Sequence, residues 1–418
     1  MTASFIQKTE PASTAVLTRD SVRRLLLSLI AVEQSMLIKK GTLSKNCAVP
    51  LLTLNRTEAE IDALTVDETS LGFDSLSRLD LVLRVNQFFS LHSSGVDDYF
   101  LVKRKIGDWV ELVLHHLALC GDDATFSFQT SGSTGNPSVI THEVTTLSAE
   151  ARMFLELMLS HKEDSTRILS LVPPHHIYGF LFSCLLPSLA DFETVDLHQK
   201  SPTSVIRQAR SGDIIIATPF IWERLVKSGQ QVPPDVLGVT SAGPSNALTW
   251  SAVGRLHLAD LMEIYGATET GGIGFRKVQN DDFTLLPHLT QDHGIVRHRS
   301  ANKTTLDLQD HLVWTGQNHF RLAGRIDQVI QVAGVNVSPQ HVEQVISQAA
   351  NVRAVHVRFE NERLKAFVIP KNGQDRATVA REVQNHVSAN LAPAARPDSI
   401  TYSDQFPRCD FGKIGSWI

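Results

Sequence analysis

The first 118 residues carry apolar side chains at helical spacing. After Thr18 these side chains share one helical face: Val22, Leu25, Leu26, Leu29 and Ile30. A second helix is predicted to begin at Asp74-Ser75, and a third over residues 106–113. Between the first two helices, the pattern predicts a long loop to about Thr69. We therefore expect a loose tail over residues 1–18 and an all-α domain over residues 19–119.

After Cys120, short apolar runs alternate with helical patterns. The runs that predict strands are Ala124–Phe128, Arg167–Val172, Asp213–Ala217, Val236–Thr240 and Leu261–Tyr265. The helical patterns lie at Leu147–Leu159, Ser204–Arg210 and Pro219–Ser228. This alternation predicts an α/β lobe with a largely parallel sheet over residues 120–323.

A smaller α+β module is predicted over residues 324–418. Its expected strands are Gln328–Val332, Ala354–Arg358 and Leu364–Ile369, and its expected helices are Gln340–Ala349 and Ala377–Leu391. The fold class is therefore α/β with a small second domain, preceded by helices.

Composition narrows the function classes. The chain has 418 residues, of which 42% are hydrophobic and 20% charged, and its net charge of −5 gives no basic surplus for nucleic acid or an anionic membrane. The four cysteines stand singly, without metal-ligand spacing, as in proteins of a reducing compartment. No signal peptide or membrane-spanning run is visible, so a cytoplasmic protein without nucleic-acid or membrane partners is expected.

The segment Thr130-Ser131-Gly132-Ser133-Thr134-Gly135 is the first candidate for chemistry. Its glycines let the backbone turn tightly and present N–H groups to an anion, and its hydroxyls can donate to phosphate oxygens. It is not a Walker A loop, because Asn136-Pro137 follow it instead of Gly-Lys-Ser/Thr. From residue types alone, it is either a flexible turn or a phosphate-binding loop.

Six blocks in order resemble the motifs of the adenylate-forming superfamily, which includes acyl- and aryl-CoA synthetases. They are TSGSTGNPS (130–138), PPHHIYGF (173–180), SAGP (241–244), YGATET (265–270), GRIDQVIQVAGVNVSPQHVE (324–343) and PRCDFGKI (407–414). Six ordered blocks over about 300 residues are far more specific than any one of them. The resemblance implies a core lobe, a mobile C-terminal domain and ATP as substrate.

The resemblance also implies roles for single residues of the nucleotide site. Tyr265 and Gly266 would lie against adenine, Thr268 would contact the α-phosphate, and Glu269 would hold Mg²⁺, which prefers hard oxygen ligands. Asp307 and Arg325 would contact the ribose. Asp307 lacks the usual preceding glycine, and a solvated aspartate is the alternative.

Further residues are implied for the acyl group and for the domain movement. His176 and the stretch Ser241-Ala242-Gly243 would line the acyl pocket. Asp327 would be the hinge, and Gly334 would lie on the thiol path. Lys413 would bridge the carboxylate and the α-phosphate, because an ammonium group stabilises the charge that develops there.

Three features depart from the superfamily pattern. Ser138 stands where the phosphate loop usually has lysine, and Asn336 stands where the hinge block usually has arginine. Only about 120 residues precede the loop, and Leu71–Leu76 resembles the attachment motif of acyl carrier proteins. That resemblance would place phosphopantetheine on Ser75. The alternative is that Asp74-Ser75 only caps a helix.

These observations predict an ATP-dependent acid–thiol ligase that forms an acyl-AMP and passes the acyl group to CoA or a carrier-protein thiol. The compact layout resembles small bacterial ligases for hydroxycinnamates and hydroxybenzoates, so an aromatic carboxylic acid is the expected substrate. Two alternatives remain open at this point: self-loading onto a pantetheine at Ser75, and a non-catalytic adenylate-binding or carrier-docking protein.

Overall fold

The computed structural model describes residues 16–43, 56–130, 138–159, 167–198, 200–299, 305–325, 330–332, 335–337, 339–360, 363–407, 414–415 and 417. The chain divides into two compact units, Met1–Gly272 and Ile273–Ile418. The boundaries predicted after residues 18, 119 and 323 stay predictions.

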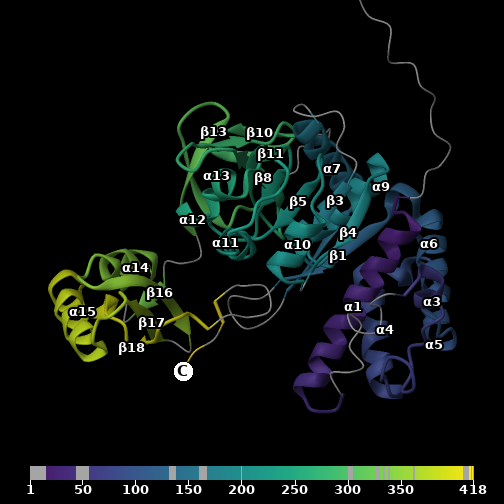
Figure 1. The fold of residues 1–418 in the computed structure, drawn as a ribbon, viewed down its shortest axis with the longest axis horizontal. Helices are drawn as coiled ribbons and strands as arrows, with labels where there is room; N and C mark the ends of the chain where they lie inside the picture. The colour runs from purple at the N-terminus through teal and green to yellow at the C-terminus, as the bar shows by residue number, and fades with distance from the viewer. Residues whose placement is uncertain are drawn as a thin grey trace, which may run out of the picture. The chain divides into compact units, whose positions relative to one another are not determined.

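The first unit begins with helices, as the apolar spacing predicts. They are α1 (Arg19–Lys39), α3 (Glu58–Asp62), α4 (Ser75–Phe89), α5 (Tyr99–Val102) and α6 (Ile106–Cys120), with 3₁₀ turns η2 (Leu91–Ser93) and η3 (Gly121–Asp123). Thr18 caps α1 by accepting from Ser21 N, which satisfies a donor that a helix start leaves unpaired. Figure 1 shows α1 lying along α4, with α6 close by.

The predicted loop up to Thr69 is wrong in one stretch, because α3 forms within it. This helix has five residues and buries none of them, so it has no apolar period for sequence analysis to detect. A capping box explains it: Thr57 accepts from Glu60 N, and the Glu60 side chain accepts from Thr57 N at 2.7 Å.

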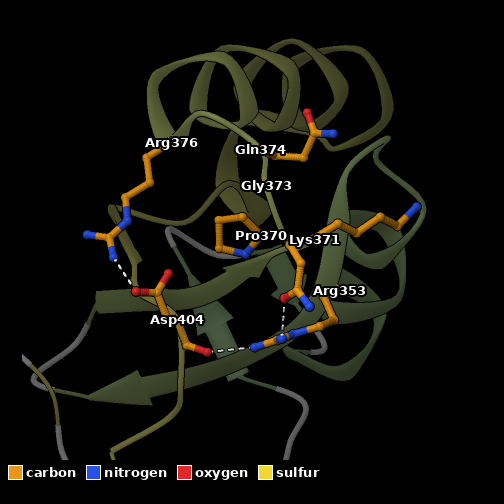
Figure 2. Close-up of a pocket in the computed structure, with 8 residues that line it drawn as sticks. Arg353, Pro370, Lys371, Gly373, Gln374, Arg376 and Asp404 are labelled. Atoms are coloured by element: carbon orange, nitrogen blue, oxygen red, sulfur yellow. Dashed lines mark hydrogen bonds and ion pairs between the residues drawn. The ribbon is translucent and has the colours of Figure 1, made fainter.

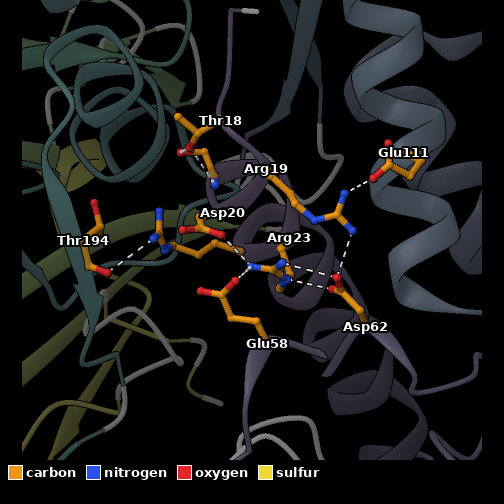
Figure 3. Close-up of polar contacts among 10 residues, drawn as sticks. Thr18, Arg19, Asp20, Arg23, Glu58, Asp62, Glu111 and Thr194 are labelled. Carbon is orange, nitrogen blue, oxygen red and sulfur yellow. Dashed lines mark hydrogen bonds and ion pairs between the residues drawn. The ribbon is translucent and has the colours of Figure 1, made fainter. Parts of the chain in front are cut away.

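An ion-pair network ties α1 to its neighbours (Figure 3). Arg23 is buried, and its Nε donates to Asp62 of α3 at 2.8 Å. Arg19 also pairs with Asp62, at 2.9 Å, and with Glu111 of α6. Arg23 lies out of water and has two further carboxylate partners, one on α1 and one on α3, so several carboxylates together compensate its buried charge.

A parallel sheet forms the centre of the first unit. Its strands are β3 (Arg167–Ser170), β4 (Glu193–Asp196), β5 (Ile214–Ala217), β6 (Leu237–Thr240) and β7 (Asp260–Ala267). They lie in the order β4-β3-β5-β6-β7 and all pair in parallel. Strands β3, β5 and β6 are buried throughout, which explains their continuous apolar runs. The predicted parallel sheet is confirmed.

Helices of the first unit connect and cover these strands. They are α7 (Val144–Leu159), α8 (Ile177–Phe180), the π-helical η4 (Leu181–Leu185), α9 (Leu186–Ala190), α10 (Pro202–Gln208), α11 (Pro219–Lys227), α12 (Ala247–Trp250) and α13 (Ala252–Leu256). The predicted strand at 124–128 is β1 (Thr125–Gln129), and it pairs antiparallel with β2 (Val139–Glu143), which sequence analysis missed. No residue of β2 is buried, so it lacks an apolar signal.

Five aromatic rings join the N-terminal helices to the rest of the first unit. Phe88 of α4 packs against Phe128 of β1 and Phe180 of α8, with ring centroids 5.5 and 6.1 Å apart. Phe89 and Phe126 complete the group. The helices therefore share a core with the sheet lobe.

The second unit consists mainly of antiparallel strands and a small α+β module. Its first strands are β8 (Gly271–Arg276), in which the division between units falls, β9 (Phe283–Leu285), β10 (Leu289–Asp292), β11 (Ile295–His298), β12 (Asp310–Trp314) and β13 (His319–Arg325). The module contains β14 (Ile330–Val332), β15 (Val335–Val337), α14 (Pro339–Ser347), β16 (Val352–Glu360), β17 (Arg363–Pro370), α15 (Arg376–Asn390), the 3₁₀ turn η6 (Pro393–Ala395) and β18 (Ser399–Tyr402). Helices α14 and α15 share one apolar core with β16 and β17 (Figure 1).

Candidate active site

The carboxyl edge of the parallel sheet gathers three of the predicted motifs. The 173–176 segment follows β3, Ser241–Gly243 follows β6, and residues 265–269 span the end of β7. Because these strands are parallel, the three segments leave the sheet at the same edge, where open α/β sheets bind ligands.

The PPHHIYGF block is held to this edge by Tyr178, which sequence analysis did not single out. Its hydroxyl lies 3.0 Å from the carbonyl oxygen of Val239 and 3.2 Å from that of Ala217, at the ends of β6 and β5. Burial raises the pKa of Tyr178 well above its usual value, so it stays a neutral donor. His176 is partly exposed at the start of α8, and its carbonyl accepts from Phe180 N.

His175 directly precedes His176 in the PPHHIYGF block. In the structure its Nδ1 lies 2.6 Å from the hydroxyl of Ser28 on α1, and its ring centroid lies 4.4 Å from that of His176. Burial, followed by the neighbouring His176, lowers the pKa of His175 well below its usual value. Helix α1 therefore contacts the histidine pair through a neutral imidazole.

The SAGP block begins with a side chain that is already bonded. The buried Ser241 hydroxyl donates to the Ile264 carbonyl at 3.0 Å and so joins the end of β6 to β7. Ala242 has a φ of 70° and is exposed, as is Gly243. An alanine in this left-handed region is strained, and such strain is typical of functional turns. The acyl-pocket role of all three residues stays a prediction.

The YGATET block forms a tight turn between β7 and β8. A Cβ on Gly266 would overlap the Gly271 carbonyl, so only glycine fits there. Buried Thr270 closes the turn, because Ala267 N donates to its hydroxyl at 3.3 Å. The side chains of Tyr265 and Glu269 are half-buried. The turn is thus rigid at its base and open along the side chains that the resemblance assigns to nucleotide and metal.

The base of the predicted phosphate loop is closed by its two end residues. Thr130 N donates to the Ser138 carbonyl at 2.9 Å, and the two hydroxyls lie 2.8 Å apart. Ser138, which stands where lysine is usual, thereby closes the loop. Residues 131–135 lie outside the described residues, so their predicted contacts with phosphate stay predictions.

The ribose candidates lie in the second unit. Exposed Asp307 precedes β12, and Asp310, the first residue of that strand, pairs with Arg325 of β13. The hairpin therefore brings the backbones of Asp307 and Arg325 to the same end. Asp327, Gly334 and Lys413 lie outside the described residues, and their roles stay predictions.

Glu150 of α7 contacts the segment just after the YGATET block, and sequence analysis did not single it out. Its side chain is buried, and Oε1 accepts from Gly272 N at 2.7 Å, just after the YGATET block. Burial raises its pKa to about 7, against a lowering by the Gly272 hydrogen bond. A signal was available: Glu150 falls three residues after buried Leu147 and four before buried Phe154, on the apolar face of the helix.

Ser75 is exposed at the first position of α4. Asp74 caps the helix, and its carboxylate accepts from Ser77 N at 2.8 Å and from the Ser77 hydroxyl at 2.6 Å. The helix-cap interpretation of this pair is confirmed for Asp74. The likeness to a carrier-protein attachment site is not supported by these contacts, since a cap explains them fully.

The carboxylate of Glu269 suits a magnesium ion that is shared with a nucleotide. Among the described residues, no three His, Cys, Asp or Glu side chains come together as a metal cage. Mg²⁺ commonly takes one or two carboxylates and completes its shell with phosphate oxygens and water. A single half-buried carboxylate at Glu269 fits that arrangement.

A pocket on the second unit contains none of the predicted site residues (Figure 2). Its two arginines are already engaged: Arg353 donates to Asn372 Oδ1 at 2.8 Å and to the Asp404 carbonyl at 2.6 Å. Arg376 pairs with the Asp404 carboxylate at 2.8 Å. These contacts tie β16 and the start of α15 to the segment after β18.

Two segments of the chain match known protein families, one in the N-terminal part and one in the C-terminal module. Residues 61–291 match the AMP-binding enzymes, and residues 341–413 match the C-terminal domain of AMP-binding enzymes. The chain belongs to the AMP-binding enzyme family, and with it to the adenylate-forming superfamily. The first match begins at residue 61, so it includes α4 and Ser75.

Curated relatives resemble the chain over nearly its whole length. It is 40% identical to a 4-coumarate–CoA ligase of Cereibacter sphaeroides, with 96% of this chain and 97% of that one covered. It is 38% identical to a 4-coumarate–CoA ligase of Rhodobacter capsulatus, with 95% and 100% covered. The predicted class, an ATP-dependent AMP-forming acid–thiol ligase with ATP and CoA as substrates, is confirmed.

Solved structures support the same fold. An O-succinylbenzoate CoA synthetase from Bacillus subtilis, in complex with AMP, matches with a TM-score of 0.52 at 18% identity, over 69% of this chain and 67% of that one. A benzoate CoA ligase from Burkholderia xenovorans matches with a TM-score of 0.51 at 16% identity, over 72% and 71%. Within the described residues, no helix is long and apolar enough to cross a bilayer.

Proposed function

We propose that this enzyme activates an aromatic carboxylic acid, of the hydroxycinnamate or hydroxybenzoate type, and transfers its acyl group to CoA. The observation that carries the proposal is the 40% identity to a 4-coumarate–CoA ligase across 96% of the chain. The site adds chemical support, because His175 and Tyr178 supply neutral polar groups at the end of a buried sheet.

In the first step, the substrate carboxylate attacks the α-phosphorus of ATP, and pyrophosphate leaves. Thr130 and the loop that follows it hold phosphate oxygens, and Tyr265 and Thr268 orient the adenosine and the α-phosphate. Lys413 places an ammonium group beside the carboxylate and the α-phosphate, where negative charge accumulates. His176 and the backbone of Ser241–Gly243 orient the acid.

Magnesium belongs to this proposal as the ion that Glu269 would hold. An ion held by Glu269 would neutralise charge on the phosphate oxygens. In the second step, the small domain turns about Asp327, Lys413 leaves the site, and the thiol of CoA approaches past Gly334. The thiol releases its proton to solvent, and the thiolate attacks the acyl carbon; the bond from that carbon to the phosphate oxygen breaks and AMP leaves.

An ATP–pyrophosphate exchange assay over a panel of aryl and fatty acids tests the proposal. Exchange is expected with 4-coumarate or a hydroxybenzoate and to fall at least about 100-fold in Lys413→Ala, because a positioned charge contributes on that scale. Undiminished exchange in Lys413→Ala would remove the role of that lysine. Exchange only with aliphatic acids would refute the aromatic substrate, and none with any acid would favour the non-catalytic alternative.

A second acceptor, a pantetheine on Ser75, is favoured by one observation only, the exposure of Ser75 at the start of α4. Incubation with CoA and a phosphopantetheinyl transferase, followed by mass spectrometry, tests it. We expect no mass gain on Ser75, and Ser75→Ala is expected to retain CoA-dependent turnover. A pantetheine adduct on Ser75 would restore the self-loading model, and loading of a separate carrier protein would place the acceptor in trans.

A further inference from the structure

Two side chains form hydrogen bonds with the backbone of the turn that contains the YGATET block, one at each end of residues 268–272. His142 of β2 lies with its Nε2 2.6 Å from the Thr268 carbonyl oxygen. Glu150 of α7 accepts from Gly272 N at 2.7 Å. Glu269, the proposed metal ligand, lies between these two attachment points. His142 therefore links the β1–β2 hairpin to the turn, and Glu150 links helix α7 to it.

The protonation states suit these bonds. A carbonyl oxygen can only accept, so the Nε2 atom of His142 must carry the proton. Burial is the largest influence on His142 and lowers its pKa, opposed by the Thr268 hydrogen bond and the charge of Glu269. A neutral imidazole with its proton on Nε2 meets this requirement, and the carbonyl partner fixes this tautomer.

The Glu150 carboxyl group packs closely against the backbone of both Gly271 and Gly272. Gly271 has a φ of 69°, and a Cβ there would lie 2.5 Å from Glu150 Oε2. The carboxyl group therefore occupies the space that a side chain at 271 would need. Burying a carboxyl group beside a single N–H donor costs free energy that an apolar side chain would not. Such a cost is common where a polar group orients a functional segment.

We propose that His142 and Glu150 are positioning residues that fix the turn bearing Thr268 and Glu269 against the β1–β2 hairpin and helix α7, respectively. The inference rests on the proposed function of those two turn residues. Without these two hydrogen bonds, the turn is no longer held at either end, and the Glu269 carboxylate moves relative to the nucleotide. Partners that orient metal ligands typically account for about 10- to 100-fold in metal affinity or activity.

The experiment compares two pairs of variants. His142→Phe and Glu150→Leu remove the hydrogen bond and keep most of the volume, whereas His142→Gln retains an N–H donor and Glu150→Gln retains an acceptor. Three quantities are measured: the Mg²⁺ concentration that gives half-maximal ATP–pyrophosphate exchange, the KM for the acid, and amide hydrogen exchange over residues 267–272 of the metal-free protein.

We expect His142→Phe and Glu150→Leu to raise the half-maximal Mg²⁺ concentration about 10- to 100-fold, with the KM for the acid within about twofold. Amide exchange over 267–272 should accelerate in both, since the Gly272 amide and the turn are released. The two glutamine variants should stay within about threefold of the unmodified enzyme.

Asp213→Asn is the matched control, because Asp213 is equally buried and pairs with Arg167 at 2.6 Å near the amino ends of β3 and β5. It should lower the melting temperature without changing the Mg²⁺ requirement. An equal rise of that requirement in Asp213→Asn would reduce the effect to general destabilisation and overturn the proposal. Unchanged amide exchange over residues 267–272 in both His142→Phe and Glu150→Leu would also overturn the proposal. This measurement does not require that any acid supports turnover.

Discussion

At the scale of single residues, burial favours the uncharged forms of the polar groups at the sheet edge. It raises the pKa of Tyr178, lowers that of His175 and raises that of Glu150 to about 7. The hydrogen bonds of Tyr178 go to backbone carbonyls, so its protonated form is the one that these contacts require. Tyr178 and His175 are therefore neutral scaffold groups, whereas Glu150 titrates near neutral pH.

Glu150 gives the first pH prediction. The pKa of Glu150 is about 7 in the folded protein, against 4.5 in the unfolded chain. Between these two pH values the folded state therefore binds a proton that the unfolded state does not. Stability from this group is present below about pH 4.5 and lost as pH rises through 7, amounting to about 3 kcal/mol. Glu150→Gln cannot titrate.

We therefore expect the unfolding free energy of Glu150→Gln, relative to the unmodified protein, to rise by about 3 kcal/mol between pH 5 and pH 8.5. Urea unfolding at several pH values measures this difference. A difference that does not change with pH would mean that Glu150 is not buried as a titrating carboxyl group.

At the scale of elements, caps and close contacts set where helices start and how they approach. Thr18, Asp74 and Asp375 each accept a backbone N–H in the first turn of α1, α4 and α15. A Cβ on Gly179 of α8 would overlap the Pro173 carbonyl, so the helix lies directly on the turn that carries His176. Local chemistry of this kind determines the geometry of the histidine segment.

The cap at α4 yields a prediction that separates two roles. Asp74→Ala should lower the free energy of unfolding by about 1 kcal/mol, because Ser77 N loses its acceptor. Ser75→Ala, next to it and exposed, should change stability by less than about 0.5 kcal/mol. Thermal unfolding of both variants provides the measurement. A larger loss for Ser75→Ala would show contacts that the cap does not account for.

Gly179 and Gly254 form a matched pair for the second element prediction. Gly179→Ala forces the start of α8 away from Pro173, and we expect at least a tenfold loss of ATP–pyrophosphate exchange, since small misplacements near reacting groups are costly. Gly254→Ala, within α13, meets nothing within 4 Å and should leave activity unchanged. It should also add about 0.5 kcal/mol of stability. Equal effects of the two would contradict the steric explanation.

At the scale of the whole molecule, the N-terminal helices are part of the first compact unit. Phe88 packs into the aromatic group of the sheet lobe, and the Ser21 hydroxyl of α1 donates to the Cys184 carbonyl at 3.0 Å. The family match beginning at residue 61 agrees with this integration. The helices therefore stabilise the lobe that carries the site, whatever their resemblance to carrier proteins.

Removal of residues 1–119 should therefore leave the lobe unable to fold, which soluble expression and exchange activity would reveal. Phe88→Ala should cost about 3–5 kcal/mol of unfolding free energy, as for other large buried rings. Leu83→Ala, on the same helix but 57% exposed, should change it by less than about 0.5 kcal/mol. A folded, active protein lacking residues 1–119 would show instead that the helices are an independent domain.

The sequence by itself determined the helical N-terminal segment, the parallel strands and the motif order that defines the family. These follow from local periodicity and from residues that lie next to one another along the chain. It did not reveal α3 or β2, because neither buries a residue. Only the tertiary structure decided that His142 and Glu150 hold the 268–272 turn. Their partners are 126 and 122 residues away, and such contacts exist only once the sheet brings those segments together.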